Sequence, residues 1–138
     1  MDRDDAEGAL AAMTHFIALY GYAYATGDVE EWQAMSDPEC VFCASVVANV
    51  EELHSHGHTN EGSQVEVHSI DATEVTIGRW YSMEASVTQA PSIERDAQGA
   101  TVEEHPAPTQ YTMTFAVVFD SVWQVRELDV VKVPDGAL

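Results

Sequence analysis

The sequence predicts an α+β domain in which three N-terminal helices pack on one face of a curved four-stranded antiparallel sheet. Apolar residues recur every three or four positions up to His54, which is the period of a helix; beyond it they alternate with polar residues, which is the period of a strand. We therefore expect the helices within about residues 5–54 and the sheet within about 63–133. The length of 138 residues suits one domain, which we place at 1–138.

The first predicted helix carries one apolar stripe and ends at Gly27, which readily takes the left-handed conformation of a helix stop. The stripe comprises Ala9, Leu10, Met13, Phe16, Ile17, Tyr20 and Tyr24. Residues 8–27 contain no Asp, Glu, Lys or Arg, but alanines, glycines and tyrosines dilute the larger apolar side chains. We interpret this segment as a buried amphipathic helix and not as a membrane span.

Two further helix starts are marked by capping residues. Asp28, with Glu31 three positions later, has the pattern of a capping box and predicts a short second helix. The Asp37-Pro38 pair predicts the start of a third helix, because proline is favoured at the first helical position. The apolar face of that helix comprises Phe42, Val46, Val47, Val50 and Leu53.

Strand-like alternation dominates the rest of the chain, after a polar loop that we expect at 57–63. The predicted strands are 65–77, 80–89, 111–119 and 122–133. Between the second and third strands lies a long excursion, 90–108, which extends a hairpin through Ile93 and Val102. Consecutive strands joined by turns favour an antiparallel sheet with one face covered by the helices.

The composition excludes several classes of function. Asp and Glu number 24 against 5 Lys and Arg, so the net charge is −19, and such a chain repels nucleic acids and anionic lipid headgroups. Apolar residues make up 46% of the chain, which excludes a disordered polyelectrolyte. No motif for a cofactor is present, and we expect none to be bound.

The first residues, Met1, Asp2 and Arg3, do not resemble the basic start of a secretory signal. If Met1 is the true start, the sequence predicts a cytoplasmic protein. The alternative is an extracytoplasmic protein whose export signal lies upstream of the residues given.

Cys40 and Cys43 have the spacing of a redox pair near a helix start, where the helix dipole stabilises a thiolate. The thioredoxin-like motif normally follows a strand, however, and these cysteines lie between two predicted helices. A structural disulfide, a pair of buried thiols and a redox pair therefore all remain open.

His54, His56 and His58 occupy alternate positions and could converge on zinc, nickel or copper. The segment runs from a helix end into a glycine-containing loop, so the three rings need not share a face. No cysteine or spaced carboxylate completes a metal signature, and we expect solvated loop histidines without a metal.

Several phrases resemble those of an uncharacterised family of actinobacterial secreted lipoproteins. They are Glu7-Gly8-Ala9, 22–28 (YAYATGD), 38–43 (PECVFC) and 123–128 (WQVREL). The order of helices and strands is similar to the cone-shaped nuclear transport factor 2-like, or cystatin-like, superfamily. Members of the lipoprotein family carry this domain behind a lipoprotein signal and a linker, and no activity is assigned to them.

The resemblance implies a disulfide between Cys40 and Cys43 and an extracytoplasmic location in which only an upstream lipid anchor contacts the membrane. We interpret the protein as a non-catalytic binding or interaction module, a lipoprotein ectodomain. Its partner would be a small molecule or another protein of the cell envelope.

The superfamily also implies an alternative function, since some members are isomerases or hydrolases with a pocket between the helices and the concave sheet. Tyr20 and Tyr24, with His15, lie along the first helix, and Glu127 and Asp129 alternate on the last strand. If that face of the strand is concave, the carboxylates would serve as general bases near the tyrosines. A bulge in the strand would instead turn both carboxylates to solvent.

Overall fold

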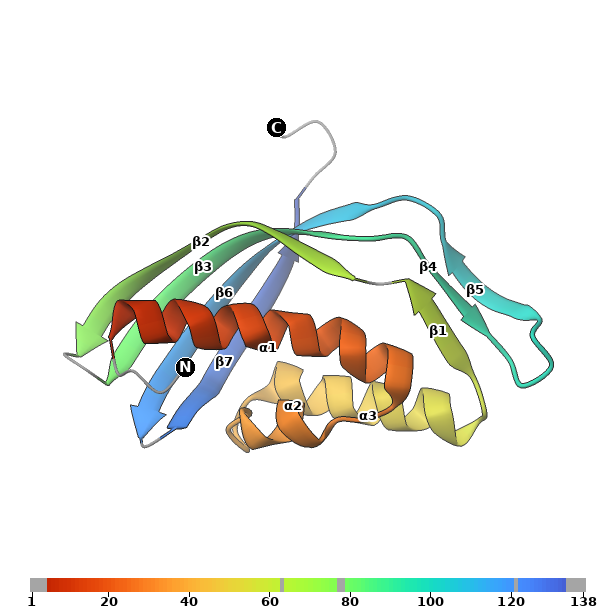
Figure 1. Ribbon diagram of the computed structural model, residues 1–138, viewed down its shortest axis with the longest axis horizontal. Helices are drawn as coiled ribbons and strands as arrows, with labels where there is room; N and C mark the ends of the chain where they lie inside the picture. Colours follow the sequence, from red (N-terminus) through yellow and green to blue (C-terminus); the bar gives the residue numbers. More distant parts are fainter. Residues whose placement is uncertain (1–4, 63, 77–78, 121, 134–138) are drawn as a thin grey trace.

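A computed structural model describes residues 5–62, 64–76, 79–120 and 122–133, and it shows helices lying on one side of an antiparallel sheet (Figure 1). The helices are α1 (Ala6–Thr26), α2 (Glu30–Ala34) and α3 (Val41–Ser55). The larger sheet has the order β2-β3-β6-β7 and comprises β2 (Val65–Thr76), β3 (Trp80–Gln89), β6 (Thr109–Asp120) and β7 (Val122–Lys132). The mixed α+β architecture and the four-stranded sheet agree with the sequence-based expectation.

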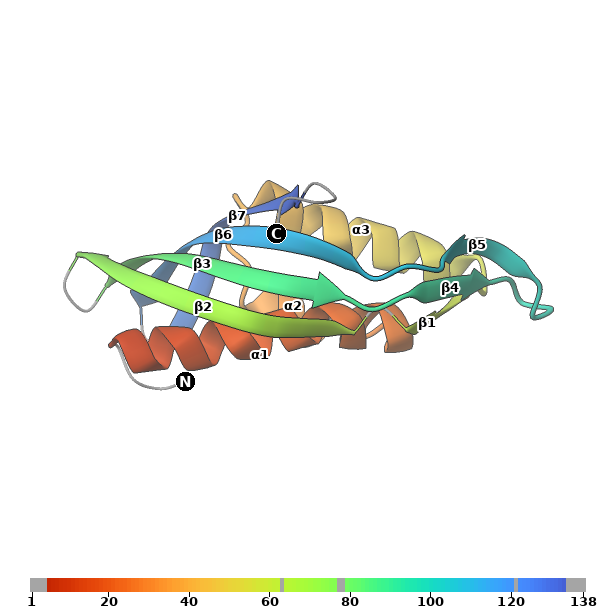
Figure 2. The same cartoon turned by 90° about the horizontal axis from the view of Figure 1, so that it is seen from above.

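A second antiparallel sheet has the order β1-β4-β5 and continues the molecule beyond the ends of β2 and β3 (Figure 2). Its strands are β1 (Thr59–Gly62), β4 (Ser92–Arg95) and β5 (Thr101–His105). Ile93 lies in β4 and Val102 in β5, as the predicted hairpin requires.

The prediction of a polar loop at 57–63 is wrong for Thr59–Gly62, which form β1 and pair with β4, and residue 63 lies outside the described residues. Backbone hydrogen bonds define this strand, and its polar sequence carries no apolar alternation that could reveal it. At its end, Gly62 has a φ of 90°, and a Cβ there would collide with the carbonyl oxygen of Pro91. Glycine is therefore required at this crossing.

Helix α1 has the boundaries that its capping residues dictate. The Asp5 carboxylate accepts a hydrogen bond from the Gly8 N–H at 2.9 Å, and Gly27 ends the helix in the left-handed region with a φ of 80°. Its apolar stripe packs against the sheet, with Met13, Phe16 and Ile17 buried. The prediction of a helix stop at Gly27 is confirmed.

The starts of α2 and α3 differ from the predicted ones. Asp28 accepts from the Glu30 N–H at 3.1 Å, but Glu31 completes no capping box and instead contacts His15, with 2.8 Å between Oε2 and Nε2. Helix α3 begins at Val41 and not at Pro38, because residues 36–37 are held beside β7 by an isolated parallel bridge, Ser36 to Val125. A backbone bound to a strand cannot also start a helix.

The core lies between α1, α2, α3 and the inner face of the larger sheet. Trp32 of α2 is buried, stacks on Phe16 with 3.9 Å between ring centroids, and donates its Nε1–H to the Cys43 carbonyl at 3.0 Å. The sheet contributes alternate buried side chains: Tyr81, Met83, Ala85, Val87, Met113, Phe115, Val117, Trp123, Val125 and Leu128.

Strand β7 changes face at a bulge. Val125 pairs with Val117 and Glu127 with Ala116, so Arg126 is the extra residue. One inserted residue inverts the alternation of all residues after it. Val125 and Leu128 are consequently both buried, and Glu127 and Asp129 are exposed.

Candidate ligand-binding site

A cavity of about 140 Å³ lies between α1, α3 and the concave face of the larger sheet. Helix α1 contributes two of its lining side chains, the first turn of α3 contributes one, and the ends of the strands contribute the others. The lining residues are Ile17, Tyr20, Phe42, Val65, Val87, Gln89, Tyr111, Met113 and Val130.

The cavity is apolar, with polar groups only from Tyr20, Gln89 and Tyr111 among its lining residues. Burial raises the pKa of the Tyr20 hydroxyl above its ordinary value, with a further contribution from Tyr24, and the side chains of Gln89 and Tyr24 hydrogen-bond to it. Tyr20 is therefore a neutral hydrogen-bonding group at neutral pH. The described lining residues include no carboxylate, imidazole or thiol, and they offer hydrogen bonds and apolar contact to a ligand.

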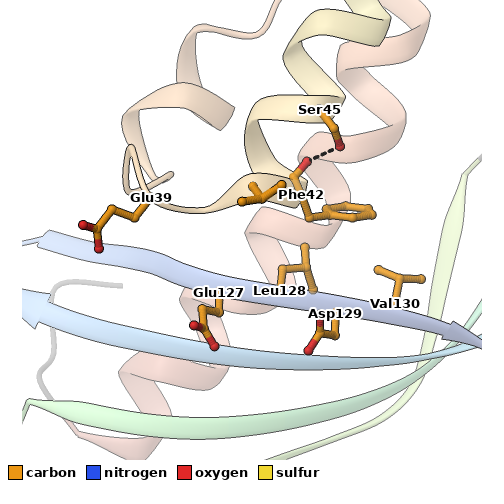
Figure 3. A pocket seen from close by; sticks show the side chains of 8 residues that line it. Glu39, Phe42, Ser45, Glu127, Leu128, Asp129 and Val130 are labelled. Atoms are coloured by element: carbon orange, nitrogen blue, oxygen red, sulfur yellow. Dashed lines mark hydrogen bonds between the residues drawn. The ribbon is translucent and has the colours of Figure 1, made fainter.

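A second hollow, an open groove of about 600 Å³, adjoins the cavity between the start of α3 and β7 (Figure 3). We call it the β7 groove. It is lined by Glu39, Val41, Phe42, Ser45, Glu127, Leu128, Asp129 and Val130. Phe42 and Val130 line both hollows, so the β7 groove and the cavity meet at these two side chains.

The structure does not bring Glu127 and Asp129 together with Tyr20 and Tyr24. Leu128 and Val130 extend from β7 toward α3, whereas the two carboxylates extend from the opposite side of the strand (Figure 3). The concave placement considered for these carboxylates is wrong, because the bulge at Arg126 turns them to solvent. Tyr24 does not line the cavity, and its ring lies against that of Tyr20 with centroids 4.9 Å apart.

The histidines considered as metal ligands do not converge, and two of them have separate hydrogen-bond partners. His54 Nε2 lies 3.0 Å from the Tyr24 carbonyl oxygen, and His58 Nδ1 lies 2.7 Å from Glu94 Oε2. His56 is exposed, with its ring centroid 5.9 Å from that of His58. Within the ranges that the structure describes, no three His, Cys, Asp or Glu side chains are grouped to hold a metal ion.

Cys40 and Cys43 form a disulfide, with Cα atoms 5.2 Å apart. Both are 1% exposed, and the Cys40 sulfur accepts the Cys43 N–H at the first turn of α3. The disulfide implied by the resemblance is confirmed. It holds the turn from which Phe42 enters the cavity, so its structural effect reaches the candidate site.

Gln89 and Tyr111 were not identified as site residues from the sequence. The alternation Tyr81, Met83, Ala85, Val87 places Gln89 at the next inward position of the same strand. A polar residue at the end of an inward-facing apolar series is a signal for a site. Tyr111 lies on the same inward face, on β6, where it pairs with Val87, the inward residue before Gln89.

Comparisons with solved structures find a similar fold in two proteins, one of which is described as having a cystatin-like fold. An uncharacterized protein with a cystatin-like fold from Caulobacter vibrioides is similar, with a TM-score of 0.58, 14% identity, and coverage of 95% of this chain and 93% of that one. The intermembrane space region of the chloroplast protein ARC6 is also similar, with a TM-score of 0.68, 16% identity, and coverage of 94% and 98%, respectively. At these identities the likeness shows the fold alone.

The family model for DUF6318, a family of unknown function, matches residues 1–129, and the chain belongs to that family. No curated protein matches the sequence. None of the described helices is long and apolar enough to cross a membrane.

Proposed function

We propose that this domain is a non-catalytic extracytoplasmic binding module of the nuclear transport factor 2-like cone type. Its cavity would hold a compact apolar group of a small molecule or of a cell-envelope protein. The observation that carries the proposal is the chemistry of the lining, which is apolar apart from two tyrosines and one glutamine. Small-molecule sites typically combine apolar walls with a few polar groups that orient the ligand, and the lining here has this composition.

The size of the cavity defines the group that fits. An engineered cavity of about 150 Å³ in another protein is known to bind benzene, and the volume here is about 140 Å³. One aromatic ring or one branched aliphatic chain would therefore fill it. Tyr20 and Gln89 would orient a hydroxyl or carbonyl attached to that group.

The rival interpretation, an isomerase or hydrolase, requires a base that reaches the ligand. Glu127 and Asp129 are exposed on the other side of β7, and neither lines the cavity. The lining therefore favours binding over acid–base chemistry.

The proposed location rests on two observations. The disulfide between Cys40 and Cys43 favours an oxidising compartment. The sequence also resembles secreted actinobacterial lipoproteins, in which an anchor upstream of this domain would hold it at the membrane surface.

Benzene tests the cavity directly, because it carries no group that could bind elsewhere by hydrogen bonds or charge. Titration of methyl-labelled protein should shift the NMR signals of Met113, Val87 and Val130 with saturation. Val65→Phe should abolish the shifts, because the larger side chain of a lining residue would fill part of the cavity. Val67→Phe is the matched control, because Val67 is equally half-buried on the same strand but does not line the cavity.

Unsaturable shifts in the wild type would contradict the proposal. Equal shifts in both phenylalanine variants would contradict the assignment of the cavity as the binding site.

A further inference from the structure

We propose that the β7 groove docks an extended, basic peptide segment of a partner protein as an added strand. One apolar side chain of that segment would enter the cavity between Phe42 and Val130. The inference rests on the proposed binding function of the cavity and names the kind of partner that delivers the apolar group.

Strand β7 is an edge of the larger sheet, and among the described residues the backbone contacts along this edge lie in its first half. The Asp37 N–H donates to the Val125 carbonyl at 2.9 Å, and the Val125 N–H donates to the Met35 carbonyl at 2.8 Å. This contact is an isolated parallel bridge, after which the chain turns away into α3. An extended segment of this protein therefore already lies on the edge, and the edge continues beyond it.

The backbone of the second half of β7 faces the groove. The Val133 N–H donates to the Gln110 carbonyl at 2.9 Å, so Val133 faces β6. Alternate residues of an antiparallel strand face alternate sides, so Leu128 and Val130 direct their N–H and C=O groups away from β6. Such an edge is a template for a further strand, and peptide recognition by strand addition uses it.

The walls of the groove suit the side chains of an added strand. Val41, the first residue of α3, is 83% exposed, and it faces a groove whose other wall holds Leu128 and Val130. Val41 would supply apolar contact to a strand that lies along this edge. Side chains of a docked strand alternate, so one can enter the cavity at Phe42 while its neighbours stay outside.

The charge of the groove selects the partner. Glu39, Glu127 and Asp129 line its rim, and no described Lys, Arg or His forms an ion pair with any of them. The whole chain has a net charge of −19, so a second copy of it would be repelled. Lysine or arginine residues flanking the apolar side chain would meet complementary charge at the rim.

The test uses acetylated and amidated hexapeptides Lys-Val-Lys-X-Lys-Val with X as Leu, Phe or Ala. Calorimetry should show that the Leu or Phe peptide binds about tenfold more tightly than the Ala peptide, since burial of the larger side chain contributes more than 1.4 kcal/mol. The amide NMR signals of Leu128 and Val130 should shift. A peptide methylated at the backbone nitrogens that would face β7 should not bind.

Two protein variants separate strand addition from general attraction. Glu39→Lys, at the rim, should weaken binding at least fivefold. Glu84→Lys is the matched control, because Glu84 is an exposed glutamate on β3 that does not line the groove. Val130→Pro should abolish binding, because it removes an N–H that faces the groove and not one that bonds β6.

The outcomes distinguish this inference from the proposed function. If benzene enters the cavity but no peptide of the series binds, the docking inference is wrong and the proposed function stands. If the N-methylated peptide binds as tightly as the unmethylated one, strand addition is wrong. If Glu39→Lys and Glu84→Lys weaken binding equally, charge alone attracts the peptide, and strand addition is likewise wrong. If neither benzene nor a peptide binds, both proposals fail.

Discussion

Asp37 and Arg126 join the segment before α3 to the bulge of β7, with 2.7 Å between Oδ2 and Nε. The Asp37 side chain is 12% exposed, and its Oδ1 accepts the Glu39 N–H at 2.8 Å. Arg126 also lies over the Trp80 ring, 5.2 Å from its centroid. One carboxylate thus orders the turn before α3 and fixes the arginine that the bulge adds to the strand.

Asp37→Ala removes both the hydrogen bond to the turn and the ion pair, and we expect a loss of about 1.5 kcal/mol of unfolding free energy. Asp37→Asn keeps an oxygen that accepts the Glu39 N–H, so it should cost about half as much. Urea denaturation of the two variants measures the difference. If both variants lose the same free energy of unfolding, the stabilisation by Asp37 comes from the ion pair with Arg126 and not from the hydrogen bond to the Glu39 N–H.

The disulfide closes a very short loop, so it restricts the unfolded chain only slightly. The double variant Cys40→Ala with Cys43→Ala should lose about 2 kcal/mol or less and remain folded at room temperature. Thermal denaturation, with and without reductant on the wild type, measures this loss. Intact mass after alkylation is the control: two modified thiols in unreduced protein from an oxidising compartment would contradict the disulfide.

Phe115 is 1% exposed at the centre of β6, where its ring meets the helices. Phe115→Ala should cost about 3–5 kcal/mol, because it leaves a cavity in the core. Thr114→Ala changes the exposed neighbour on the outer face of the same strand and should alter stability by less than about 0.5 kcal/mol. A wild-type urea midpoint for Phe115→Ala would contradict the register of the strand.

The sequence predicts much of the fold because the period of apolar residues differs between its two parts. The stripe of α1 and the alternation of β3 and β6 follow directly from that period, and Gly27 marks a stop that needs no tertiary context. Strand β1 escapes prediction because its residues are polar and its pairing with β4 depends on residues far away in the chain. Propensity carries no information about such a pairing.

The site is less predictable than the fold, because one inserted residue decides which side chains face inward. Alternation from Trp123 and Val125 would place Glu127 inward, and the bulge at Arg126 places Leu128 there instead. The apolar Leu128 and Val130 are the signal in the sequence for this change of face. Tyr20 can be identified from the sequence because it belongs to the apolar stripe of the first helix. Gln89 can be identified only if the inward alternation of its strand is known to extend to the last residue of the strand.

Tyr20 makes the stability of the domain sensitive to alkali. Burial raises the pKa of its hydroxyl in the folded protein, whereas in the unfolded chain it loses its proton at about pH 10. Above that pH the unfolded state binds fewer protons than the folded state, so the unfolding free energy falls, by up to about 1.4 kcal/mol per pH unit for this one group. Tyr20→Phe should remove that part of the slope between about pH 9 and about pH 11, measured by urea denaturation. Tyr22→Phe, on an exposed tyrosine of the same helix, should leave the contribution of Tyr20 in place, and equal slopes in the two variants would contradict the burial of the Tyr20 hydroxyl.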